Sequence, residues 1–193
     1  MPRAGLSKDA VVDLALTVVD EEGFARLTLA AVASRAGVAV PSLYKHVAGL
    51  PDLRREVALR CVEEFAAHLR EVGAGAPAAE PQTRVRALAH AVRGFALAHP
   101  GRYTAVQGGS WARDPEATAV QLAAGRSVAL LAEALGRLGL PDQDTIDAVR
   151  AVRALVHGFV TLELDGGFGL PDDVSASFAR AVDAMVAGLT PEE

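Results

Sequence analysis

Apolar residues recur at intervals of three and four along almost the whole chain, which is the spacing of one face of an α-helix. No stretch of useful length alternates between apolar and polar residues, as a half-buried strand would. The pattern predicts about nine helices, over residues 7–22, 28–36, 39–46, 52–72, 82–98, 102–107, 114–138, 142–164 and 173–187. We therefore expect an all-α protein.

The breaks between the apolar stripes carry residues that start and end helices. Gly23, Gly37 and Gly139 each follow a stripe, where glycine can adopt the conformation that ends a helix. The Asp-Pro-Glu triplet at 114–116 combines a capping acid with a proline at the first helical position, and predicts a helix start at residue 114. The sequence GAGAPAAEP at 73–81 is the clearest predicted linker.

Residues 28–47 give the clearest indication of function. Thr28 can cap one short helix, Gly37 can end it, and a second short helix follows a few residues later. Two helices joined by a tight turn with Gly are typical of a helix-turn-helix, whose second helix enters the DNA major groove. Leu43 can face inward, and the residues left largely outward are Val40, Pro41, Ser42, Tyr44, Lys45 and His46. The alternative is a short capped surface helix without a ligand.

The charge distribution limits how the chain could bind DNA. Its net charge is −5, but residues 1–55 hold seven basic and six acidic side chains, so this part is the less acidic one. Phosphate binding must then come from local placement of charge. Arg3, Arg54 and Arg55 are candidates to supply it, unless they merely cover a solvated helix face.

The remaining composition restricts the class of protein. Apolar residues make up 51% of the 193, and the single cysteine, Cys61, excludes an internal disulfide framework. No apolar run reaches the ~18 residues that suggest a membrane span. We expect a soluble, cytoplasmic protein that does not insert into membranes.

Residues 7–53 resemble the DNA-binding domain of the tetracycline-repressor (TetR) family. The positions that carry the resemblance include Gly23-Phe24, Leu27-Thr28, Ala36-Gly37-Val38 and the run from Leu43 to Val47. Less specifically, residues 95–103 (FALAHPGRY) and 156–169 (VHGFVTLELDGGFG) resemble a subgroup of C-terminal domains named after a Trp-His-Gly motif, with Val156 in place of Trp. The resemblance implies a three-helix DNA-binding domain over residues 1–51 and a larger helical domain for ligand binding and dimerisation over residues 52–193.

The resemblance also implies roles at DNA. Tyr44 and His46 would hydrogen-bond phosphates, Lys45 would reach a phosphate or a base edge, and Ser42 could do either. Val40 and Pro41 could contact a thymine methyl group, and the helix N-terminus at Thr28 could offer N–H donors to phosphate. Three positions where relatives carry polar residues are apolar here, namely Leu29, Ala30 and Leu50.

The regulation implied by the family is that of a homodimeric repressor, which a small molecule releases from a palindromic operator. In this family the last two long helices usually form the dimer interface. The candidate interface residues on these helices are Ala148, Ala151, Leu155, Gly158, Leu162, Phe178, Val182 and Met185. The small residues on helix 142–164 would let two helices approach closely. The alternative is a central helix within a monomer.

A pocket between helices of the larger domain is the default ligand site. The uncommon residues that could line it are Phe95, Tyr103, Gln107, Trp111 and Phe159, although each could simply be part of the core. The low aromatic content favours a flexible apolar ligand over a planar, stacked one.

Two other classes of function remain open at this stage. For a helical enzyme, the five histidines offer no metal-binding pair four residues apart, and Cys61 has no histidine nearby in sequence. We expect neither a catalytic site, nor a metal, nor a cofactor. The third class is a dimeric module that binds small molecules without specific DNA binding, which the weak positive charge of residues 1–55 leaves open.

Overall fold

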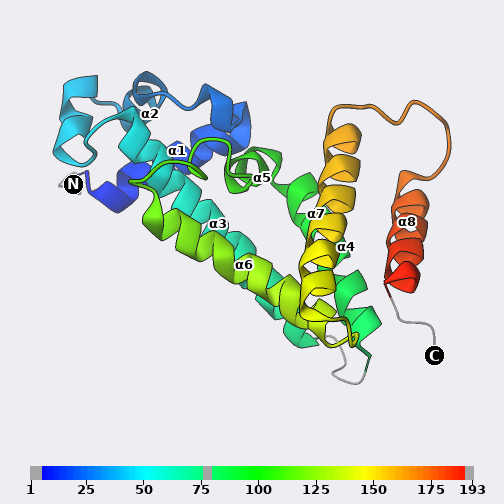
Figure 1. The fold of residues 1–193 in the computed structure, drawn as a ribbon. Helices are drawn as coiled ribbons and strands as arrows, with labels where there is room; N and C mark the ends of the chain where they lie inside the picture. The colour runs from blue at the N-terminus through cyan, green and yellow to red at the C-terminus, as the bar shows by residue number, and fades with distance from the viewer. Residues whose placement is uncertain (1–5, 76–79, 190–193) are drawn as a thin grey trace. The chain divides into compact units, whose positions relative to one another are not determined.

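The computed structural model describes residues 6–75 and 80–189, and within them the chain is all-α, as predicted (Figure 1). The helices are α1 (Lys8–Glu22), η1 (Phe24–Arg26), α2 (Leu29–Ala36), η2 (Val40–Lys45), α3 (Leu50–Gly75), α4 (Pro81–Ala98), α5 (Pro100–Val106), α6 (Thr118–Gly136), α7 (Asp142–Leu164) and α8 (Val174–Gly188). Both η elements are 3₁₀-helices. Arg3 and residues 76–79 of the predicted linker lie outside the described residues. No helix in the described ranges is long and apolar enough to cross a membrane.

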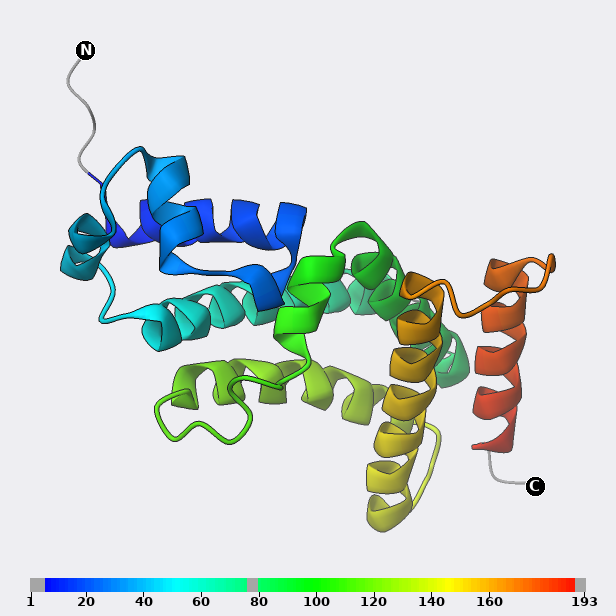
Figure 2. The same cartoon turned by 90° about the horizontal axis from the view of Figure 1, so that it is seen from above.

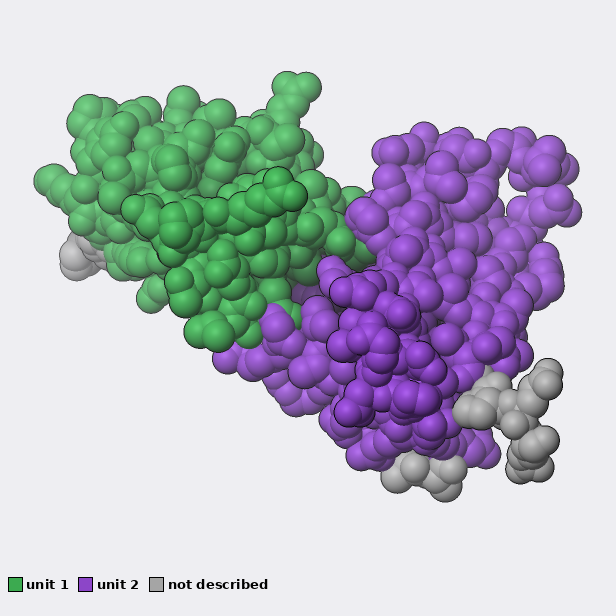
Figure 3. Space-filling model, in the orientation of Figure 1, with its two compact units in different colours: residues 1–64, 99–124 green, residues 65–98, 125–193 purple. Residues whose placement is uncertain are grey.

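The described residues form two compact units, coloured separately in Figure 3. Unit 1 consists of the residues up to 64 together with 99–124, and unit 2 of residues 65–98 together with 125–189. The predicted functional boundary at residues 51 and 52 lies in the first turn of α3. That boundary concerns which residues bind DNA and which bind a ligand, and it stays a prediction.

Unit 1 has its core around α1, which packs against α2, η1 and α5. Its largest buried side chains are wholly inaccessible to water, among them Leu27, Leu43 and Leu53. Figure 2 shows α1 beside the first half of α3. Three ion pairs join the two helices, one of them between Arg60 and Asp9 at 4.0 Å. Lys8 pairs with Glu56 at 2.7 Å, and Arg60 pairs with Asp13 at 3.5 Å. These ion pairs hold α1, against which α2 packs, to α3.

Unit 2 is built on α4, α7 and α8, each of which packs against the other two (Figure 1). Phe178 of α8 is fully buried at their centre, with the rings of His90 and Phe159 each 5.1 Å away. The guanidinium of Arg93 on α4 donates from Nε to Glu163 of α7 at 2.7 Å and from Nη2 to Ser175 of α8 at 3.1 Å. One arginine therefore holds three helices together.

The predicted helix start at residue 114 is wrong, because α6 begins at Thr118. The Asp114 carboxylate accepts a hydrogen bond from the Glu116 N–H at 2.9 Å and another from Arg55 at 3.2 Å. The Gln121 side chain donates to the carbonyl of Asp114 at 2.8 Å. Residues 114–116 therefore form a turn that precedes α6.

Helix α3 begins at Leu50, earlier than the predicted residue 52. From the first turn, the Asp52 carboxylate reaches back and accepts a hydrogen bond from the Ala48 N–H at 2.9 Å. The Gly49 carbonyl accepts the first helical bond from Leu53 at 3.0 Å. The Asp52 carboxylate therefore pairs a backbone N–H of the loop between η2 and α3, and this bond holds the loop against the first turn of α3.

Candidate nucleic-acid interface

Helix α2 starts and ends where the sequence predicts. The Thr28 hydroxyl accepts a hydrogen bond from the Ala31 N–H at 3.1 Å, which makes Thr28 the N-cap. Gly37 has a φ of 66°, in the left-handed region, and its N–H donates to the carbonyls of Ala33 and Ser34. These two caps fix the length of α2 and the direction in which the chain leaves it.

The second helix of the motif, η2, is a 3₁₀-helix rather than an α-helix. Its hydrogen bonds join residues three apart, from the Ser42 N–H to the Ala39 carbonyl and from the His46 N–H to the Leu43 carbonyl, both at 2.9 Å. In such a helix residues three apart lie on the same edge. Leu43 is fully buried, and Val40 and His46, three residues on either side, are half-buried with it.

This periodicity decides which predicted DNA contacts are available. Pro41, Tyr44 and Lys45 are exposed, and the Tyr44 side chain reaches 57% exposure. Ser42 is half-buried and Thr28 is exposed at the start of α2. The expectation that Val40, Ser42 and His46 face largely outward is wrong, because all three are half-buried. The three-residue repeat places Val40 and His46 on the edge that carries Leu43.

Most basic side chains near the motif are already paired within unit 1. Arg35 binds the carboxylates of Glu21 and Glu22, and its hydrogen bond lowers the pKa of Glu21. Arg54 donates to the Leu27 carbonyl at 3.3 Å, and Arg55 pairs with Glu116 at 2.8 Å as well as with Asp114.

Arg54 and Arg55 therefore hold parts of unit 1 together, and Arg55 carries no uncompensated charge. Among the described basic residues up to 55, Lys45 and Arg26 are exposed and make no hydrogen bond or ion pair. On η2, the charge available to a phosphate is that of Lys45.

The five predicted pocket residues are divided between the two units. Tyr103 and Trp111 are buried in unit 1 and Gln107 is exposed there, whereas Phe95 and Phe159 belong to unit 2. The Trp111 indole N–H donates to the Ala105 carbonyl at 2.8 Å. In unit 2, Phe95 packs edge-on against Phe65, with ring centres 5.1 Å apart. Phe95, Tyr103, Trp111 and Phe159 thus each pack within their own unit. That any of the five residues contacts a ligand remains a proposal.

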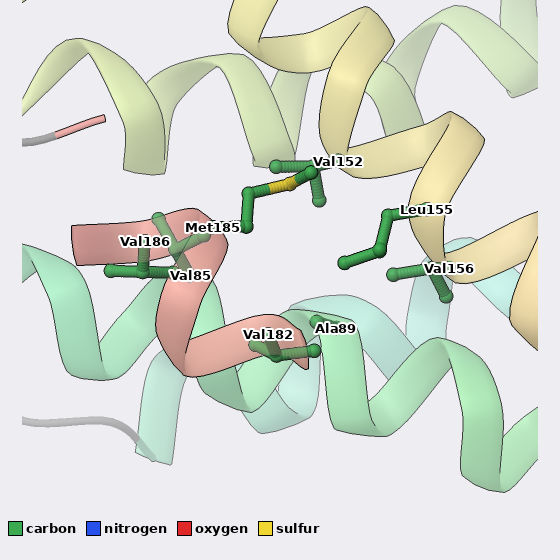
Figure 4. A pocket seen from close by; sticks show the side chains of 8 residues that line it. All are labelled: Val85, Ala89, Val152, Leu155, Val156, Val182, Met185 and Val186. Atoms are coloured by element: carbon green, nitrogen blue, oxygen red, sulfur yellow. The ribbon is translucent and has the colours of Figure 1, made fainter. Parts of the chain in front are cut away.

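Figure 4 shows an apolar hollow between α4, α7 and α8. It is lined by Val85, Ala89, Val152, Leu155, Val156, Val182, Met185 and Val186. Its volume is about 10 Å³, which is room for one water molecule. A hollow of this size admits no effector without movement of the surrounding helices.

Unit 1 contains a larger hollow of about 170 Å³. Its lining consists of Leu50, Pro51, Arg54, Arg55, Ser110 and Asp114. Arg55 and Asp114 face each other as an ion pair, whereas the third charged group, Arg54, donates only to neutral backbone carbonyls.

The predicted interface residues of α7 and α8 fall into two groups. Ala148, Phe178 and Val182 are buried within unit 2, so their own chain already covers them. Ala151, Gly158 and Leu162 are exposed, and Leu155 and Met185 are half-buried. The second group forms an apolar stripe that a partner could cover. We refer to these five residues as the α7/α8 stripe.

Two further residues of unit 1 fix the position of α5, and no periodicity identified them. Gly101 of α5 approaches the α1 backbone so closely that an added Cβ would lie 2.0 Å from the Val19 carbonyl oxygen. The next residue, Arg102, donates to Asp20 of α1 at 2.8 Å and 2.6 Å and to Glu64 of α3 at 2.6 Å. Pairing with Asp20 raises the pKa of Arg102. Both lie in the segment FALAHPGRY. The resemblance of this segment to the family's C-terminal domains is the sequence feature that could have identified them.

The described residues offer little to an enzyme. Cys61 is fully buried, and burial raises the pKa of its thiol to about 12, so it is protonated at neutral pH and a poor nucleophile. No group of three side chains that could hold a metal ion occurs in the ranges 6–75 and 80–189.

Comparison with known proteins connects this geometry to a family. The family model described as "Bacterial regulatory proteins, tetR family" matches residues 11–47. The model of the "Tetracyclin repressor-like, C-terminal domain" matches residues 85–185. An HTH-type transcriptional regulator of Mycobacterium tuberculosis, Rv0681, is 38% identical over 167 residues, which cover 84% of this chain and 72% of that protein.

Two solved structures share the fold at lower identity. A Rhodococcus protein of unknown function is 24% identical, with a TM-score of 0.83 over 99% of this chain and 100% of that one. A TetR variant from Acinetobacter baumannii, in complex with minocycline, is 22% identical, with a TM-score of 0.68 over 95% of this chain and 96% of that one.

Proposed function

The chain belongs to the TetR family of DNA-binding transcriptional regulators, and we propose that it works as a homodimeric repressor that a small apolar molecule releases from a palindromic operator. The observation that carries the DNA-binding part is the pair Tyr44 and Lys45, exposed on η2 directly after a well-capped α2. In this proposal, residues 1–51 read DNA in the cytoplasm. Residues 52–193 bind the effector and form the dimer.

At the operator, phosphate contacts position the domain and a few side chains specify sequence. Tyr44 hydrogen-bonds a phosphate, and Lys45 reaches a phosphate or a base edge. Pro41 offers apolar contact, and the first turn of α2 after Thr28 offers free N–H donors to a phosphate. The half-buried Ser42, His46 and Val40 contribute less surface.

The dimer part of the proposal is supported by the α7/α8 stripe. Covering exposed apolar surface with a second copy of the chain lowers the free energy. Small residues at positions 151 and 158 let the two copies of α7 approach closely. A symmetric pair must hold its two reading helices one DNA turn apart, ~34–36 Å, to occupy successive major grooves.

The effector part is supported by the apolar interior of unit 2. The minocycline complex of the A. baumannii relative also supports a small-molecule effector, although it does not indicate which molecule acts here. Enrichment of genomic DNA on the purified protein, followed by release with a panel of apolar molecules, tests the whole proposal. If no site is enriched, the repressor function is wrong.

Replacing Lys45 by alanine is expected to reduce the salt dependence of operator binding. If Lys45 contacts a phosphate, the slope of log K against log salt should fall by about 0.9, the value for one released counterion. Fluorescence anisotropy over a salt series measures this slope. Lys8→Ala serves as the control, because Lys8 already pairs with Glu56. An unchanged slope with altered sequence preference would instead assign Lys45 to base reading.

Replacing Leu162 by glutamate is expected to weaken the dimer at least about a hundredfold, because a buried unpaired charge costs several kcal/mol. Leu162 is 51% exposed within its own chain and belongs to the α7/α8 stripe. Analytical ultracentrifugation over a concentration series gives the dimer Kd. Leu170→Glu is the control, since Leu170 is 77% exposed in the connection after α7. A Leu162→Glu protein that stays dimeric would place the interface elsewhere.

A further inference from the structure

The hydroxyl group of Ser127 on α6 is buried and lacks a hydrogen-bond partner. Its side-chain oxygen is inaccessible and unpaired, and the residue as a whole is 9% exposed. Within residues 6–75 and 80–189, it is the one polar or charged residue that counts as buried. Buried polar groups are nearly always hydrogen-bonded, so an exception of this kind calls for a physical reason.

The helix itself offers a partner that other residues of this chain use. Thr17, Thr104 and Thr145 each donate a hydrogen bond to the carbonyl four residues earlier, at 3.1, 3.0 and 3.2 Å. Such back-bonding is the usual solution for a hydroxyl inside a helix. Ser127 does not use it, and its hydroxyl is left without a partner.

The surroundings of Ser127 on its own helix are apolar. At helical spacing on either side lie Val120, Ala123 and Ala134, all buried. A buried nitrogen also lacks a partner in Arg84, but another nitrogen of that guanidinium lies 3.7 Å from Glu133. Ser127 is thus the buried side chain in the described part of unit 2 whose single polar atom has no hydrogen-bond partner. It does not line the hollow between α4, α7 and α8.

We propose that Ser127 is the residue that recognises the polar group of the effector, and that the effector is an apolar molecule carrying one hydroxyl or carbonyl group. This inference rests on the ligand-responsive function proposed above. The bound molecule supplies the hydrogen bond that the free protein lacks. An unpaired hydroxyl weakens the free protein and discriminates against a hydrocarbon without a polar group.

Two flexible probes of similar shape, 1-decanol and decane, test the proposal on the full-length protein. The wild type is expected to bind 1-decanol about fivefold to tenfold more tightly, the contribution of one hydrogen bond. Ser127→Ala should remove this preference, and Ser127→Thr, which keeps the hydroxyl, should retain it. Binding is followed by fluorescence titration without DNA.

The thermal stability of the free protein provides the second measurement. Ser127→Ala is expected to raise Tm by about 2–4 °C, because it removes an unpaired buried hydroxyl. The control Ser177→Ala on α8, whose hydroxyl accepts a hydrogen bond from Arg180 at 3.1 Å, should leave the preference between probes unchanged.

The proposal is overturned if the wild type binds both probes equally or neither, or if Ser127→Ala lowers Tm, as expected for a hydroxyl with a structural partner. Failure of the repressor function would appear separately, as the absence of enriched DNA.

Discussion

Replacing Gly101 by alanine is expected to destabilise the protein by about 3 kcal/mol, the upper part of the usual range for an overpacked site. The new methyl group would lie 2.0 Å from the Val19 carbonyl oxygen and 2.9 Å from its carbon, which are backbone atoms of α1. Because a backbone cannot rotate away as a side chain can, α5 must move off α1. Thermal unfolding should show a fall in Tm of about 6–12 °C.

Gly94→Ala on α4 is the matched control for this change. An added Cβ at residue 94 meets no atom within 4 Å, so the substitution only gains helix propensity. It should stabilise the protein by about 0.5–1 kcal/mol. If Gly101→Ala behaves like Gly94→Ala, then α5 does not approach α1 as closely as described.

Displacing α5 also breaks the contacts of Arg102, so the effect of Gly101→Ala should extend to DNA binding. Arg102 bridges Asp20 of α1 and Glu64 of α3, and α1 supports the reading helices. Operator affinity should therefore fall together with stability. A variant that loses stability but keeps its affinity would show that the position of α5 does not matter to the reading helices.

Replacing Arg93 by methionine is expected to cost about 3 kcal/mol of stability. Arg93 and Glu163 are only 12% and 17% exposed, and the loss of one partner leaves the other charge in a mostly dry site. The change also removes the bond to Ser175 and the guanidinium that lies 5.2 Å from the Phe178 ring centre. Urea unfolding with an unchanged m-value measures the difference.

The same helices provide both a control and a rescue. Arg150→Met breaks the pair with Asp147, whose members are 71% and 63% exposed, so this change should have an effect within about 0.5 kcal/mol. The double variant Arg93→Met with Glu163→Leu removes both charges and should recover most of the lost stability. Equal losses in Arg93→Met and Arg150→Met would contradict the tight packing of α4, α7 and α8.

The sequence predicted those features of the fold that depend on neighbouring residues. Thr28 and Gly37 cap α2 as expected, because a capping hydroxyl and a left-handed glycine act on the backbone within a few residues. The bounds of α7, residues 142 and 164, were likewise predicted, from the helix start at Pro141-Asp142 and the glycine-rich turn after Leu164. Family membership also followed from the sequence, since its motif is a local spacing of residues.

The predictions from sequence failed where residues far apart in the chain compete for the same hydrogen-bonding groups. The 114–116 triplet has every local mark of a helix start, yet Arg55, 59 residues away, takes the Asp114 carboxylate. Arg54 and Arg55 were predicted to lie at a DNA-facing or solvated surface. Their actual partners lie on η1 and its C-cap, and in the turn at 114–116, which no spacing rule links to α3.

The candidate DNA contacts also show which features follow from the sequence and which require the structure. Sequence placed six side chains on one short helix, but their exposure depends on whether the helix repeats every 3.6 or every 3.0 residues. Only the structure showed the shorter repeat, which exposes Tyr44 and Lys45 and half-buries His46.

By itself, the sequence determined the helical class, the helix-turn-helix and its family, because these follow from periodicity and capping along the chain. The tertiary structure alone decided which charges stay available, which apolar residues of α7 and α8 are left for a partner, and that Ser127 is buried without a hydrogen bond. Each of these depends on packing between segments far apart in sequence, and a hydrophobic pattern does not specify which distant atoms meet.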